Sequence, residues 1–409
     1  MYNPEEQNTN SSDQLMSEVL KILAVDNQPS LGQVIEQRRE ALKLSVKAAS
    51  EVLGVPRTSY ERLIKGELQK LDVLTALKLA HFLDVSIEEI MKLFVASSMP
   101  AEDFKEVERV KEASFIVKNF DIEGLKKIGF IQSSNFTHIK ERIIEFFSLN
   151  SLYEYTQEAS SVLYSKGKVI SDDKVMGFWI LSAYKQFEKI NNPNPFDLDQ
   201  IKRLAVQIRP YTRKEKTGLQ TVIQALYKAG VTVITQKALP KTSVRGGTFI
   251  VNKKPCIILT DLYKRYPTLW FTLLHELAHV IFHLNRLSGY KYHLTDGIED
   301  PMLIESQADK FAQELLIPRE KYDYIKNHLN IESFVQSYSE KNNIHASIIY
   351  ALYAWELKEK GDDSGWARFN RFIPHSDICF DSLAYSPWLE KTVDESAEKS
   401  KSTLVTTHK

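Results

Sequence analysis

The sequence is short of cysteine. Only Cys256 and Cys379 occur in 409 residues, and they do not form a CxxC pair. This excludes a disulfide framework and a zinc site built from cysteines, and it fits a reducing cytoplasm. No apolar run reaches the roughly 18 residues that a membrane span needs, so we expect no membrane segment. The first residues, MYNPEEQNTNSSDQ, lack a basic region followed by an apolar one, so no secretory signal is expected. These absences predict a cytoplasmic protein.

A net charge is also lacking, because Lys and Arg together number 53, and so do Asp and Glu. Overall charge therefore argues neither for nor against a nucleic-acid partner, although a basic patch could still be local. The length allows two or three domains at about 100–200 residues each. The hydrophobic fraction of 43% and the charged fraction of 26% are ordinary for a globular protein.

Composition and periodicity predict five segments. Residues 1–28 are polar and predict a flexible tail, whereas residues 29–96 show five short amphipathic helices. Residues 97–210 continue as helix without a chemical motif, which predicts a helical connector. Residues 211–360 combine helices with runs rich in β-branched residues, which predict an α+β domain with a small sheet. Residues 361–409 form a C-terminal extension whose end is expected to be disordered.

The segment HELAH, residues 275–279, lies inside an otherwise apolar run, LWFTLLHELAHVIFH. Residues four apart share one face of a helix, so His275 and His279 can both reach one zinc ion. Glu276 lies at the edge of that face, where it can act as the base for a zinc-bound water without being a ligand. A catalytic zinc site needs a third protein ligand and keeps one position open.

Two candidates for the third ligand follow the motif. On an unbroken helix His283 lies about 12 Å along the axis from His275, and zinc–nitrogen bonds of about 2.0–2.1 Å cannot bridge that span. Glu305 and Asp309 lie four apart in the amphipathic segment LIESQADKFAQELLIP. The expected ligands are therefore His275, His279 and Glu305, as in thermolysin-like peptidases. Asp309 would accept a hydrogen bond from a ligand histidine. Each feature alone is commonly structural, but their combination favours a metal site.

Residues 44–67, LSVKAASEVLGVPRTSYERLIKGE, show the pattern of two short helices joined by a turn at Gly54. Six apolar residues would form the inner face: Ala49, Val52, Leu53, Val55, Tyr60 and Leu63. The side chains expected to face the major groove of double-stranded DNA are Arg57, Thr58, Ser59, Glu61 and Arg62. A plain helical interaction domain would have the same periodicity.

Residues 31–94 resemble the Xre, or lambda-repressor-type, helix-turn-helix domain. Residues from about 160 to about 320 resemble ImmA/IrrE-type metallo-endopeptidases, on the strength of LWFTLLHELAHVIFH and ESQADKFAQELLIP. The resemblance implies a mainly α, multidomain fold: a five-helix lambda-repressor-like domain, a helical connector and an α+β zincin-like domain that carries the HExxH helix. It also implies a zinc endopeptidase of the HExxH…ExxxD type, with Zn²⁺ as cofactor and Glu276 as catalytic base.

The sequence departs from the repressor pattern at two positions. Val46 stands where these domains commonly have Gln, and Ile64 replaces an acidic residue near the end of the recognition helix. Arg39 matches the arginine that often pairs with that acid, so its partner is expected to be lost. Two features that the resemblance implies are therefore in question, namely one DNA contact and the internal ion pair.

The resemblance implies two alternative functions. Family members cleave or regulate transcriptional repressors in mobile elements, toxin–antitoxin loci or stress responses, which suggests operator DNA and a repressor or antitoxin-type protein as partners. Alternatively, the chain is an antitoxin-like or autoregulatory DNA-binding protein whose peptidase domain is a latent sensor or docking module. A homodimer is expected only by analogy with repressors that bind paired half-sites.

Two details of substrate binding are also expected. The run GGTFIVN, residues 246–252, is expected to be an edge strand that pairs with an extended substrate. The donor that would stabilise the oxyanion stays open among Tyr263, Tyr290 and His293.

Overall fold

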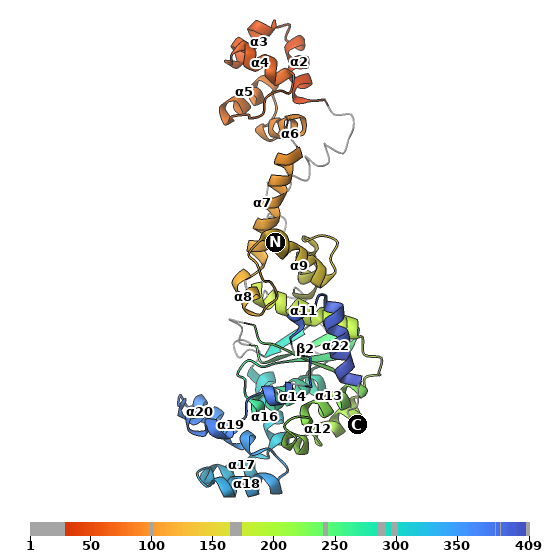
Figure 1. Cartoon of the computed structure of the whole chain (residues 1–409), viewed down its shortest axis with the longest axis vertical. Coiled ribbons are helices and arrows are strands. Elements are labelled where there is room, and N and C mark those ends of the chain that lie inside the picture. The colour runs from red at the N-terminus through yellow and green to blue at the C-terminus, as the bar shows by residue number, and fades with distance from the viewer. Residues whose placement is uncertain are drawn as a thin grey trace. The chain divides into compact units, whose positions relative to one another are not determined.

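The computed structural model describes eight stretches of the chain: residues 29–98, 101–163, 174–239, 244–284, 292–295, 302–380, 382–384 and 386–405. It divides into two compact units, Met1–Lys111 and Glu112–Lys409 (Figure 1). The tail expected at residues 1–28 lies outside the described residues. Within the described stretches, no helix is long and apolar enough to cross a membrane.

The first unit contains the five short helices that the sequence predicts, and α7 begins in it. They are α2 (Leu31–Ala41), α3 (Val46–Leu53), α4 (Arg57–Ile64), α5 (Val73–Leu83) and α6 (Ile87–Ser98), followed by α7 (Ala101–Asn119). Capping side chains begin several of these helices: Ser45 accepts from the Ala48 amide, and Asp72 accepts from the Thr75 amide. Gly54 ends α3 with φ +58°, a left-handed conformation that suits glycine and sets the turn between α3 and α4.

The inner face of the turn between α3 and α4 is largely as predicted. Ala49, Leu53, Tyr60 and Leu63 are buried in one hydrophobic core. Val52 was expected in that face, but its side chain is 65% exposed. Because Ala49 and Leu53 lie four apart on the buried stripe of a two-turn helix, Val52 falls outside the stripe.

The acid that would pair with Arg39 from position 64 is missing, as expected, but Arg39 keeps an internal ion pair with another partner. Its guanidinium lies 2.8 Å from the Glu36 carboxylate and also donates to the Leu44 carbonyl at 2.8 Å. The Tyr60 hydroxyl donates to Glu36 at 2.9 Å, which connects α4 to α2. The hydrogen bond from Arg39 holds the pKa of Glu36 below its usual value. An acid on α2, one turn before Arg39, thus replaces the acid missing at Ile64.

The second unit is built on a four-stranded sheet in the order β1-β3-β2-β4. The strands are β1 (Thr232–Gln236), β2 (Gly246–Val251), β3 (Lys254–Thr260) and β4 (Tyr292–Thr295). β1 runs parallel to β3, whereas β2 is antiparallel to both β3 and β4. β2 is therefore an inner strand, and its expected position at the sheet edge is wrong. The short segment YHLT gave too little strand pattern to reveal that β4 covers it.

Helices from both ends of the second unit share one core with the sheet. Before β1 come α8 (Ile122–Lys127), α9 (Phe136–Phe147), α10 (Glu154–Leu163), α11 (Lys174–Ile190), α12 (Leu198–Ala205) and α13 (Gly218–Lys228). After β3 come α14 (Tyr266–Ala278), α16 (Met302–Leu316), α17 (Arg319–Ile325), α18 (Glu332–Lys341), α19 (Ala346–Glu359), α20 (Ser364–Phe369), α21 (Asp377–Phe380) and α22 (Val393–Val405). The expected connector thus does not stand apart: from Ile116 onward its buried residues belong to the core of the second unit.

The C-terminal segment was expected to be disordered, but residues Val393–Val405 form α22, which packs against α11 and α13. Its buried face includes Ala397 and Leu404, and Ser396 bonds to the buried Gln186 side chain at 3.1 Å. Just before α22, the Arg142 guanidinium donates to three backbone carbonyls between residues 388 and 391. Small polar residues on the buried face hid the helix from a search for apolar periodicity. Residues 406–409 lie outside the described residues.

We expect Leu404→Ala to destabilise the second unit by about 2–5 kcal/mol, because Leu404 is 2% exposed and truncation of its side chain leaves a cavity under α22. Val405→Ala is the matched control, because Val405 is 61% exposed and its substitution should cost less than about 0.5 kcal/mol. Urea unfolding followed by tryptophan fluorescence measures this unit alone, since all five tryptophans follow residue 112. Equal midpoints for the two variants would contradict the packing of α22.

Candidate metal centre

The candidate site lies on α14, which packs beneath β3 and β2 and beside α16. Every residue of α14 except Phe271 is buried, including His275 and Glu276. The chain then continues as one π-helical turn, η2 (His279–His283), so the helix is not the unbroken α-helix assumed from the sequence. α16 brings its acidic residues back along the same face of α14.

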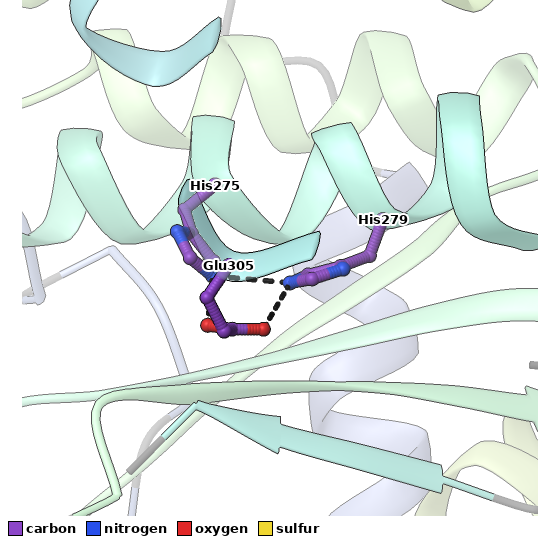
Figure 2. A group of neighbouring side chains, drawn as sticks. All are labelled: His275, His279 and Glu305. Carbon is purple, nitrogen blue, oxygen red and sulfur yellow. Dashed lines mark hydrogen bonds and ion pairs between the residues drawn. The ribbon is translucent and has the colours of Figure 1, made fainter. Parts of the chain in front are cut away.

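Figure 2 shows how His275, His279 and Glu305 converge. The two histidine Nε2 atoms lie 3.1 Å apart. The Glu305 carboxylate lies 3.1 Å from Nε2 of His275 and 3.2 Å from Nε2 of His279. Both imidazoles are buried, and the Glu305 side chain is one quarter exposed. The sequence named all three residues, and the structure brings their ligand atoms within 4.8 Å of one another.

This donor set fits a zinc ion. Bonds of about 2.0–2.2 Å in a tetrahedral site place neighbouring ligand atoms about 3.3–3.5 Å apart. The three observed separations, 3.1, 3.1 and 3.2 Å, lie close to that value. Two histidines and one carboxylate also match the ligand types of catalytic zinc sites, which leave a fourth position for water or substrate.

Asp309 lies behind His275, as predicted, with Oδ1 2.8 Å from Nδ1 of the ring. Burial lowers the pKa of His275, but hydrogen bonds with the Asp309 and Glu305 carboxylates outweigh it and raise the pKa to about 9. The two carboxylates therefore favour positive charge at this ring. A ligand histidine that gives its second N–H to a carboxylate has a fixed orientation and is a stronger metal ligand.

Glu276 is fully buried beside the cluster and belongs to no ligand group among the described residues. The Thr248 hydroxyl on β2 donates to Oε2 of Glu276 at 2.8 Å, and this fixes the carboxylate. Gly246 on the same strand makes room for it: a Cβ atom there would lie 3.0 Å from Oε1 of Glu276 and 2.5 Å from Cγ2 of Thr272. Neither Thr248 nor Gly246 was named from the sequence, although the pair Gly246-Gly247 was a signal of close packing.

His283, the rejected third ligand, is also excluded by the structure. Its Nδ1 lies 3.1 Å from Nδ1 of His279, on the opposite side of that ring from the cluster. The oxyanion donor stays open. Tyr263 is 47% exposed in the turn before α14, whereas Tyr290 and the side chain of His293 lie outside the described residues.

The residues expected to contact DNA lie on α4. Arg57, Thr58 and Arg62 are exposed, and Ser59 and Glu61 are partly exposed. Arg57 bonds to Glu61 one turn later, with Nε 2.9 Å from Oε1. The helix therefore presents polar side chains outward while it buries Tyr60 and Leu63.

Comparison with protein families agrees with both units. Residues 35–90 match the family model described as helix-turn-helix, and residues 227–338 match the one described as IrrE N-terminal-like domain. The second range includes the three candidate ligands, Glu276 and Asp309. No curated protein and no solved structure matches the chain. The two matched ranges correspond to a helix-turn-helix domain of the Xre type followed by a peptidase domain of the ImmA/IrrE type.

We expect the purified chain to bind about one zinc ion and Glu305→Ala to weaken that binding at least tenfold, because the variant loses the charged ligand. Glu314→Ala is the control, since it removes an exposed glutamate from the same helix. Competition with a chromophoric chelator measures both affinities. Equal zinc affinity for the two variants would contradict the role of Glu305 as a ligand.

Proposed function

We propose that this protein is a DNA-binding regulator and a zinc-dependent endopeptidase. The observation that carries the proposal is the cluster of His275, His279 and Glu305 with the buried Glu276 carboxylate one residue away from the first ligand. A site used only for structure would close the ion with a fourth protein ligand, whereas the described residues supply three.

The ligands would be His275, His279 and Glu305, and zinc held there would supply Lewis-acid activation of a water molecule and of the substrate carbonyl. Glu276 would accept the proton of the attacking water and deliver it to the leaving amine. The Thr248 hydroxyl donates to Oε2 of Glu276 and so orients the carboxylate. Oε1, the other carboxylate oxygen, would then be the one that accepts the proton of the attacking water. Asp309 keeps Nδ1 of His275 protonated, which turns its Nε2 toward the ion.

The substrate proposed is a helix-turn-helix repressor or an antitoxin-type protein, supplied in trans or by the first unit of this chain. The fusion of the two domain types supports this proposal. A peptidase that is joined to a DNA-binding domain would be brought to the operator where the repressor that it cleaves is bound. The exposed Arg57 and Arg62 of α4 are the side chains proposed to bind that operator. Toxin–antitoxin loci and mobile elements are the proposed genetic settings.

We expect Glu276→Gln to keep its zinc but to lose proteolysis by about 10²–10⁴-fold, because glutamine has the shape of the base without its proton affinity. Wild type and variant are each co-expressed with the products of neighbouring genes, and fragments are identified by mass spectrometry. A fragment that forms equally with both proteins would discard the role of Glu276.

The same variant separates the proposal from a regulator without turnover. A reporter fused to the protein's own promoter should lose its regulated response in Glu276→Gln if proteolysis is the output. If the response persists in both Glu276→Gln and His275→Ala, the peptidase domain serves as a sensor or docking module instead.

We expect Arg62→Ala to weaken operator binding by about 1–3 kcal/mol if the side chain contacts a base, or to lower the salt dependence by about one ion if it contacts a phosphate. Arg368→Ala, an exposed arginine in the second unit, gives the same change of net charge and should leave binding unchanged. Fluorescence anisotropy over a salt series measures both quantities. Identical curves for the two variants would remove α4 from the DNA interface.

A further inference from the structure

A third imidazole, that of His283, lies behind the metal centre, on the far side of His279. Nδ1 of His283 is 3.1 Å from Nδ1 of His279, and Nε2 of His283 is 3.1 Å from Oε1 of Gln307. Both rings are buried, with His283 only 4% exposed, and Gln307 lies on the exposed side of α16. The three side chains form a row that ends at Nε2 of His279, the atom that faces His275 and Glu305.

The direction of the hydrogen bonds in this row follows from its outer end. An amide oxygen can only accept, so Gln307 receives the proton of His283 at Nε2. A neutral imidazole carries a single N–H, and the Nδ1 atom of His283 is then an acceptor. His279 must donate from its own Nδ1, which leaves the lone pair of that ring on Nε2.

We infer that His283 and Gln307 are positioning residues for the metal ligand His279: they select the tautomer whose Nε2 lone pair points at the ion and they hold the plane of the ring. This inference rests on the metal centre proposed above. The sequence motif is therefore longer than HExxH, because the histidine four residues further on completes the support of the second ligand.

The two ligand histidines are supported in different ways by the same helix. Asp309 supports His275 with a charged acceptor, whereas Gln307 supports His279 through a neutral ring. Because Gln307 precedes Asp309 and reaches the later histidine, α16 runs antiparallel to α14 along the site. The π turn spans His279–His283 and so contains both histidines of the second support, and such turns are frequent at functional sites.

Zinc affinity tests the inference in the full-length chain, by competition with a chelator. His283→Leu and Gln307→Met should each weaken zinc binding about 10–100-fold, the usual cost of losing a partner that orients a ligand. His283→Asn should recover much of the affinity, because its side-chain oxygen occupies the place of Nδ1 and still accepts from His279. Gln313→Met on the same helix is the matched control and should bind as wild type does.

The visible absorption of bound cobalt(II) gives a second readout that a purely structural role would not change. The spectrum should shift in His283→Leu and return toward that of the wild type in His283→Asn. If His283→Leu does not fold, as judged by circular dichroism without metal, the Gln307 variants decide the test, since Gln307 is exposed.

The outcomes separate the inference from the proposal on which it rests. If wild type binds one zinc ion and both His283→Leu and Gln307→Met match it in affinity and spectrum, the positioning role is overturned while the metal centre stands. If wild type itself binds no zinc, the metal centre fails and the inference fails with it.

Discussion

The second unit depends on one electrostatic constraint: two buried ring nitrogens face each other at 3.1 Å with a carboxylate against both. If both rings present lone pairs, this arrangement is repulsive unless a cation lies among them. The hydrogen bonds on the other side of each ring strengthen the need for a cation. Asp309 bonds to Nδ1 of His275 and His283 bonds to Nδ1 of His279, so the Nε2 atoms of both rings are the ones left to present lone pairs. The local structure therefore favours a positive charge at the point where the three side chains meet.

The surrounding fold supplies what that point needs. α14 presents His275 and the π turn that follows it presents His279. α16 returns with Glu305, Gln307 and Asp309, and Thr248 on β2 contacts Glu276. The absence of a side chain at Gly246 lets the strand approach the carboxylate. Helices that precede and helices that follow the sheet in the sequence share one hydrophobic core. α11 and α22, for example, pack against each other although they lie about two hundred residues apart in the chain.

The sequence was sufficient where chemistry and helical spacing coincide. His275, His279, Glu305 and Asp309 could be named because residues four apart share a helix face, and the five helices of the first unit had clear caps and turns. Partners that pair across the fold could not be named. Thr248 on β2 carries no spacing rule that links it to Glu276. Glu36, by contrast, lies three residues before Arg39 on the same helix, so helical spacing could have revealed this partner, and the prediction overlooked it. The prediction that β2 is an edge strand was wrong because the strand that covers it, β4, is only four residues long and gives little sequence pattern. The prediction of a disordered C-terminal end was wrong because the buried face of α22 is mostly small and polar.

Diffraction from crystals grown with zinc, recorded on both sides of the zinc absorption edge, tests the central claim most directly. We expect one anomalous peak about 2.0–2.2 Å from Nε2 of His275, Nε2 of His279 and the carboxylate of Glu305. A peak at any other group of side chains, or none at these three at full zinc loading, would contradict this account of the site.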